Sequence, residues 1–321
     1  MRRVACALLL STLLSCSGPV QPHSSPTTSP KTERSIAVLP RSVPEDGSDI
    51  AFMSTRNGSA ELFVMRADGS HAQSITSDEA DHLFPAWSPD GRDIVYVHAE
   101  GGLPTGDFDL HVLVGGDDEV LTEGPRRDVA PAWSPNGDDI AYESAIAGEP
   151  NIYVISLASH RTVRITKVHA PAYQPSWSPD GRRIAFAVRV PRCTLSDEAC
   201  EQHIWVADPD GSSAVELTSG KEHDGEPEWS PDGTAISFTS DRGERGNFDV
   251  WVMRADGSRR QRLTHNPMLD LNAVWSPDGS RMAFASNRDG DFEIYLMDAD
   301  GNNQINISND HTAQDATPSW R

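Results

Sequence analysis

The chain has 321 residues and carries 27 Lys+Arg against 48 Asp+Glu, a formal net charge of −21. This charge argues against a nucleic-acid partner, because phosphate binding requires a basic surface, and against purely electrostatic attachment to anionic lipids. With 37% hydrophobic residues, 24 glycines and 23 prolines, the composition favours many short strands joined by tight turns over a helical core.

The first 15 residues have the pattern of a bacterial signal peptide. Arg2 and Arg3 precede an apolar run at residues 4–14. A segment that spans a bilayer needs about 20 apolar residues, so this run is too short to do so. Its length is that of a signal-peptide core. Residues 13–16 (LLSC) resemble a lipobox, in which the cysteine receives a lipid. We predict a lipoprotein signal peptide over residues 1–15 and lipidation of Cys16. The alternative is a plain secretory signal followed by a chance cysteine.

Residues 16–45 are rich in serine, threonine and proline. Such a segment cannot bury enough apolar surface to offset the entropy lost on ordering it, so we predict a disordered tether. The signal and anchor predict an extracytoplasmic location in the bacterial cell envelope, with the lipid holding the chain to a membrane. Disulfides persist in that compartment, so Cys193 and Cys200 are predicted to close a small loop, with two free thiols as the alternative.

The remaining chain, residues 46–321, is built from a repeated unit. Five units carry the motif Trp-Ser-Pro-(Asp/Asn)-Gly, in which proline and glycine favour a turn. Short apolar segments surround each motif, so one unit reads as four strands. Six equivalent tryptophans are separated by 46, 44, 52, 46 and 45 residues: Trp87, Trp133, Trp177, Trp229, Trp275 and Trp320.

The two ends of this region carry complementary parts of the unit. Residues 50–52 (IAF) open it without a preceding tryptophan, and Trp320 closes it without a following strand. A four-stranded unit repeated six times is typical of a β-propeller. We predict an all-β, six-bladed propeller whose last strand joins the first blade and so leaves no exposed edge. An open solenoid or two sandwiches would not explain why the piece missing at one end is present at the other.

The repeat also resembles that of a known family. Residues 275–301 (WSPDGSRMAFASNRDGDFEIYLMDADG) are similar to the repeat of TolB-type propellers, and the likeness extends over residues 49–321. It implies a six-bladed propeller with one face that binds a protein partner, as TolB propellers bind a peptidoglycan-associated protein of the Tol–Pal system. Propellers of this type carry unrelated activities, so the resemblance is more specific for the fold than for the function.

One face of the predicted propeller collects the irregular features of the sequence. Loops between second and third strands contain Arg56, Arg242 and Arg288, together with an insertion at residues 190–201. The loops before the tryptophan strands open on the same face. At or beside the fifth position before five of the six tryptophans they carry an aspartate or a histidine: Asp81, His82, Asp128, His223, Asp224, Asp270 and Asp315. Ala172 stands at this position before Trp177. We predict a polar channel mouth that binds a cationic side chain, a peptide or a divalent cation. The alternative is structural, with aspartates that cap their own loops or pair with arginines of a neighbouring blade.

Catalytic signatures such as Gly-x-Ser-x-Gly or His-Glu-x-x-His do not occur in the sequence. The tryptophans are expected to pack between blades. We therefore expect a monomeric binding or scaffolding module for a cell-envelope protein or peptide, without a cofactor unless a divalent cation occupies the channel mouth. One alternative is a metal-dependent lyase or hydrolase acting at that mouth. Another is a glycan-binding sensor, for which Phe84 and Tyr173 are the nearest aromatic residues.

Overall fold

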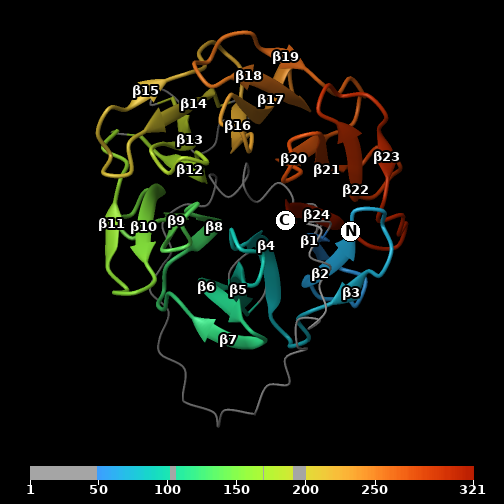
Figure 1. The fold of residues 1–321 in the computed structure, drawn as a ribbon, viewed down its shortest axis with the longest axis horizontal. Coiled ribbons are helices and arrows are strands. Elements are labelled where there is room, and N and C mark those ends of the chain that lie inside the picture. Colours follow the sequence, from blue (N-terminus) through green and yellow to red (C-terminus); the bar gives the residue numbers. More distant parts are fainter. Residues whose placement is uncertain (1–48, 102–105, 169, 191–199) are drawn as a thin grey trace.

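The computed structural model describes residues 49–101, 106–168, 170–190 and 200–321. Within these residues the strands form six four-stranded sheets, and Figure 1 shows the sheets arranged radially around a common axis. The predicted all-β, six-bladed propeller is confirmed. No helix in the described part of the chain has the length and apolar character needed to cross a membrane. The predicted signal peptide, the tether, Cys16 and Cys193 lie outside the described residues.

Each blade contains four antiparallel strands, here called A to D from the channel outward. The A strands are β4 (Asp81–Trp87), β8 (Asp128–Trp133), β12 (Ala172–Trp177), β16 (Asp224–Trp229), β20 (Asp270–Trp275) and β24 (Asp315–Trp320). The B strands are β1 (Asp49–Ser54), β5 (Ile94–Glu100), β9 (Asp139–Ser144), β13 (Ile184–Arg189), β17 (Ala235–Glu244) and β21 (Arg281–Ser286). The C strands are β2 (Glu61–Arg66), β6 (Asp107–Val114), β10 (Asn151–Ser156), β14 (Gln202–Ala207), β18 (Asn247–Arg254) and β22 (Glu293–Asp298). The short D strands are β3 (Gln73–Ser74), β7 (Asp117–Val120), β11 (Thr162–Arg164), β15 (Val215–Glu216), β19 (Gln261–Arg262) and β23 (Ile305–Asn306).

Hydrogen bonds within the repeated motif shape the turns between A and B strands. In the first of these turns, Ser88 Oγ donates to Asp90 Oδ1 at 2.7 Å and accepts the backbone N–H of Asp93 at 3.0 Å. The N–H of Gly91 donates to the Ser88 carbonyl at 2.8 Å. Gly91 has a φ of 67°, which glycine adopts without strain. The motif therefore reverses the chain locally and starts strand B next to strand A.

Every A strand contains a bulge before its tryptophan. The pairing register between A and B strands shifts there in all six described blades. The bulge places one residue of each A strand, three positions before the tryptophan, at a φ between 49° and 53°: Phe84, Ala130, Gln174, Glu226, Asn272 and Thr317. A bulge bends a strand and redirects a side chain, and all six residues line the central cavity.

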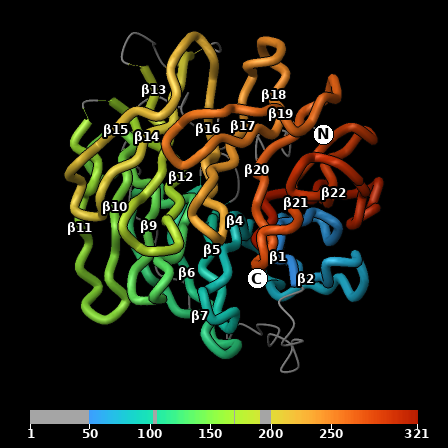
Figure 2. Tube along the Cα trace, turned by 45° about the horizontal axis from the view of Figure 1, so that its top comes forward, coloured from blue at the N-terminus to red at the C-terminus, as the bar shows by residue number. Residues whose placement is uncertain are grey.

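The two ends of the described chain meet in one blade. Strand β24 pairs antiparallel with β1, with Trp320 opposite Ile50 and Asp315 opposite Ser54. Figure 2 shows the blue strands β1 and β2 beside the red C-terminal segments. The predicted closure is confirmed. It replaces an exposed strand edge with backbone hydrogen bonds.

Buried apolar side chains fill the spaces between neighbouring blades. In one of these clusters, Phe52 and Phe63 pack with Ile294 and Leu296 of the adjacent blade, and Trp320 lies against them. This burial of apolar area is the main favourable contribution to folding. It also holds the A strands around the axis, where they form the walls of the channel.

Candidate functional site

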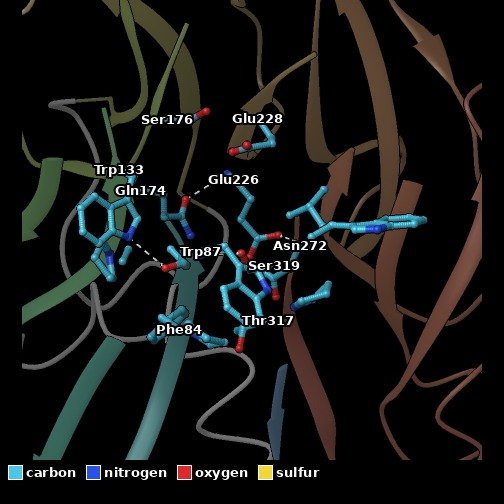
Figure 3. A pocket seen from close by; sticks show the side chains of 18 of the residues that line it. Phe84, Trp87, Trp133, Gln174, Ser176, Glu226, Glu228, Asn272, Thr317 and Ser319 are labelled. Atoms are coloured by element: carbon cyan, nitrogen blue, oxygen red, sulfur yellow. Dashed lines mark hydrogen bonds between the residues drawn. The ribbon is translucent and has the colours of Figure 1, made fainter. Parts of the chain in front are cut away.

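The A strands enclose a cavity of about 300 Å³ on the propeller axis. Phe84 and Ala130, from two consecutive blades, give its wall an apolar sector. The bulged residues of the other four blades are polar: Gln174, Glu226, Asn272 and Thr317. Figure 3 shows Gln174, Glu226 and Asn272 lying close together in this polar sector. The four polar residues were not predicted from the sequence, although their constant position three residues before each tryptophan was a usable signal.

Hydrogen bonds connect the polar sector across blades. The backbone N–H of Glu226 donates to Gln174 Oε1 at 3.0 Å. Glu226 Oε2 accepts the backbone N–H of Asn272 at 2.8 Å and the hydroxyl of Thr239 at 2.6 Å. Three successive A strands are therefore linked through Glu226, by its backbone N–H on one side and by its carboxylate on the other. Hydrogen bonds to a carboxylate are charge-assisted and strong, so the Glu226 side chain holds its own A strand to the next one.

A second glutamate of the cavity wall, Glu228, has a pKa near neutral pH. Burial raises the pKa of Glu228 to about 7, and hydrogen bonding to Ser176 only partly opposes this effect. Figure 3 shows both side chains at the same end of the cavity. The channel thus holds a carboxyl group that takes up a proton near neutral pH.

Five of the six repeat tryptophans border the cavity: Trp87, Trp133, Trp177, Trp275 and Trp320. Trp87 is buried, and the Nε1–H of Trp133 donates to the carbonyl of Ala86 in the preceding blade at 3.0 Å. Trp275 makes the equivalent bond to the carbonyl of Glu228 at 3.4 Å. These contacts fit the expected packing role, because each indole spans two A strands.

Four of the five predicted mouth aspartates are not exposed at the channel mouth. Asp128, Asp224, Asp270 and Asp315 have exposed fractions of 0–1%. Each begins an A strand, next to the serine that ends or lies within the paired B strand. Ser144 donates to Asp128 and Ser240 to Asp224, both at 2.5 Å. The expectation of an open acidic ring is therefore corrected, because these carboxylates hold the A and B strands of their own blades together.

The predicted arginines complete three of these pairs. Arg56 lies 2.6 Å from Asp315, Arg242 lies 2.6 Å from Asp224, and Arg288 lies 2.9 Å from Asp270. Each partner belongs to the same blade, and not to a neighbouring blade as the alternative interpretation supposed. The three arginine side chains are only 17–18% exposed. The pairs confirm that B–C loops and D–A loops share one face of the propeller.

Burial still opposes ionisation of these aspartates. It raises the pKa of Asp315 although Arg56 and Ser54 stabilise the anion. It also raises the pKa of Asp128, against the hydrogen bond from Ser144. Desolvation therefore outweighs the favourable partners, as expected for a carboxylate removed from water.

The β4–β7 blade departs from this pattern. His82 occupies the aspartate position and is paired with His98, which occupies the serine position. The carboxylate of Asp78 lies beside both imidazoles, with its Oδ1 3.3 Å from His82 Nε2 and its Oδ2 3.6 Å from His98 Nε2. Burial acts to raise the pKa of Asp78, but the two imidazoles outweigh it and lower that pKa. Asp81 accepts the backbone N–H of Ala60 at 3.0 Å, so it connects two blades.

His223 contacts the backbone of Cys200, the described member of the predicted disulfide. Its Nδ1 donates to the carbonyl of Cys200 at 3.1 Å, and its ring meets Phe248 edge to face at 5.3 Å. Burial lowers the pKa of His223, so the neutral form is favoured. Cys200 is buried. Because Cys193 lies outside the described residues, the disulfide remains a prediction.

Aromatic residues offer little support for a sugar-binding platform. Tyr173 is 1% exposed and packs in an apolar cluster between two blades. Phe84 does line the cavity. A sugar ring would therefore meet one aromatic side chain of the two that the sequence suggested.

Comparisons with known proteins agree with this architecture. The family model for the TolB beta propeller domain matches residues 85–193, 115–247 and 243–321. A TolB homolog of Chlorobium chlorochromatii is 31% identical over 140 residues, which is 44% of this chain and 31% of that protein. The Tol-Pal system protein TolB of Francisella tularensis is 31% identical over 204 residues, which is 61% of this chain and 43% of that protein.

A solved structure shares the fold. TolB from Acinetobacter baumannii superposes with a TM-score of 0.72 at 23% identity, covering 86% of this chain and 67% of the other. The chain spans only 31–43% of the length of the two curated relatives described above. The family model, in contrast, matches well over half of the residues. The chain therefore belongs to the TolB beta propeller domain family.

Proposed function

We propose that this chain is a protein-binding propeller of the bacterial cell envelope, anchored by a lipid on Cys16 and acting as a monomer. Its relatives include a Tol-Pal system protein, which supports a protein partner of that system. A peptidoglycan-associated protein is the partner we propose. The strongly acidic chain, with a net charge of −21, suits a protein or peptide with basic groups better than an anionic polymer.

The partner docks on the loop face, defined here as the B–C and D–A loops of all blades. The observation that carries this proposal is the difference between the two faces. The A–B turns repeat one motif, whereas the loop-face segments vary in length and composition and include the insertion at residues 190–201. Two large apolar side chains, Ile146 and Met268, are each 40% exposed on these loops. Exposed apolar groups within a polar surface are typical anchors of protein interfaces.

The residues predicted at the channel mouth position the loops of this face. In the proposal, the buried Asp128, Asp224, Asp270 and Asp315 hold the loops in place, and Arg56, Arg242 and Arg288 offer their partly exposed guanidinium edges to the partner. Asp81, His82 and His223 position the adjoining D–A loops.

Binding can be measured by biolayer interferometry with the purified peptidoglycan-associated protein of the same organism. The double variant Ile146→Asp/Met268→Asp should weaken binding by at least about tenfold, because it places charge on both apolar anchors. Asp256→Lys, on a C–D turn of the opposite face, is the control and should bind like the wild type. Equal affinity of the double variant would reject the loop face, and a wild type that does not bind would reject this partner.

The anchor has its own test. Growth with a labelled fatty acid should label the wild-type protein, and Cys16→Ala should abolish that label. A label that persists in the variant would contradict lipidation at this residue.

A further inference from the structure

The histidine pair of the β4–β7 blade is not required by the propeller fold. At the two paired positions occupied by His82 and His98, four other blades carry an aspartate and a serine, as in Asp128 with Ser144. The β12–β15 blade carries Ala172 and Val188 there. The strands therefore pair equally well without imidazoles, and the histidines need another explanation.

The geometry of the cluster matches a metal site. The Asp78 carboxylate and both imidazoles offer ligand atoms that lie within 4.8 Å of one another. The contacts of 3.3 Å and 3.6 Å between the Asp78 oxygens and the imidazole nitrogens are longer than charge-assisted hydrogen bonds, which measure about 2.7–2.9 Å. A tetrahedral zinc ion with ligands at about 2.0–2.1 Å separates neighbouring ligand atoms by about 3.3–3.4 Å.

Burial gives a second, independent indication. His82 and His98 are 1% and 5% exposed. The Nε2 atom of His98 is buried and has no hydrogen-bond partner among the described residues. An unsatisfied buried nitrogen is costly, and a metal ion would satisfy it. The Asp78 side chain is 30% exposed, so the cluster can be reached from the loop face.

The surroundings of the cluster also favour a cation. Asp109 lies opposite His98 in the pairing of β5 with β6. His111 stacks on His98 at a ring distance of 4.5 Å, and its Nδ1 lies 2.9 Å from Asp118. The neighbouring strands thus carry two further carboxyl groups near the imidazoles, those of Asp109 and Asp118.

We propose that Asp78, His82 and His98 bind a divalent transition-metal ion of the Zn²⁺ type. Two imidazole nitrogens and one carboxylate oxygen are a common set of three protein ligands for zinc. The set leaves one coordination position for water or for a group of a bound molecule. The site lies on the loop face, but the inference stands on this geometry and does not depend on the proposed protein partner.

The test is a titration of chelator-treated protein, purified without a polyhistidine tag, with ZnCl₂ in a calorimeter. We expect one equivalent per chain, together with a rise in the melting temperature. Co²⁺ should give the visible absorption of a tetrahedral ion. The variant His82→Ala/His98→Val, which copies the pair of the β12–β15 blade, should weaken Zn²⁺ binding by at least about 100-fold, and Asp78→Asn by at least about tenfold.

His203→Gln is the matched control, because His203 is also buried, in a different blade, where its Nδ1 lies 2.6 Å from Glu216. It should bind Zn²⁺ like the wild type. If the double variant does not melt cooperatively, Asp78→Asn decides the matter, since this substitution keeps the shape of a partly exposed loop residue. A wild type without stoichiometric binding, variants that bind normally, or loss of binding in His203→Gln would each overturn the assignment.

Discussion

Arg321 Nη2 lies 2.7 Å from Asp49 Oδ2, so the C-terminal residue is ion-paired with the first residue of strand β1. The Arg321 guanidinium also lies 4.4 Å from the centroid of the Trp87 ring, in the next blade. The closing strand is therefore held by backbone pairing, an ion pair and a cation–π contact at one joint.

These contacts predict that the stability of the propeller depends on its last strand, β24. Removal of residues 315–321 should abolish the cooperative melt or lower its midpoint sharply, because β1 becomes an exposed edge. Trp320→Ala should lower the free energy of unfolding by about 2–3 kcal/mol, since the indole packs on an apolar cluster but is partly exposed. Trp320→Phe serves as the milder control. Thermal melting of the truncated protein and urea denaturation of the two Trp320 variants measure these losses. If the truncated protein and Trp320→Ala both unfold like the wild type, the closed ring is refuted.

The aspartate–arginine pairs predict that the same Asp→Ala substitution costs more stability in a blade with the arginine than in a blade without it. Asp224→Ala should destabilise the protein by about 3 kcal/mol, because it leaves the largely buried Arg242 without its closest carboxylate. Asp128→Ala should cost only about 1–2 kcal/mol, since Asp128 bonds to Ser144 and its blade has Ile146 in place of the arginine. Chemical denaturation of the two variants makes the comparison. Equal losses would show that the guanidinium adds nothing.

Glycines at similar turns should tolerate alanine differently. Gly211 and Gly137 have φ values of 75° and 78°, so alanine is strained at both by about 1 kcal/mol. A Cβ at Gly211 would clash with the carbonyl oxygen of Ile165 in the preceding blade, whereas at Gly137 nothing lies within 4 Å. Gly211→Ala should therefore lower the melting temperature much more than Gly137→Ala. Similar melting temperatures would mean that the blades are free to move apart at this contact.

Glu228 predicts a pH-dependent stability. Burial raises its pKa from 4.5 to about 7, so the folded state holds this proton more tightly than the unfolded state does. Its contribution to stability is then largest below about pH 4.5 and is lost as the pH rises to about 7. Glu228→Gln should be more stable than the wild type by about 1–2 kcal/mol at about pH 8 and equally stable at about pH 4.5, allowing for solvent in the cavity. Urea titrations at both pH values check this, and a pH-independent difference would contradict it.

The amino-acid sequence alone determined the number of blades, the order of their strands and the closure of the ring. The tryptophan spacing, the turn motif and the complementary ends are local properties of the chain, and local hydrogen bonding and apolar burial convert them directly into strands and turns. The shared face of the B–C and D–A loops followed from antiparallel order within a blade.

Only the tertiary structure decided what the polar residues do. Asp224 and Asp270 have the sequence pattern of a polar mouth, but packing encloses them with Arg242 and Arg288. The cavity wall at Glu226 depends on a bulge that turns one side chain toward the axis. Asp78 meets His82 and His98 only because strands A and B pair beside the D–A loop. Such contacts depend on the direction and depth of side chains in space, which the spacing of residues along the chain does not specify.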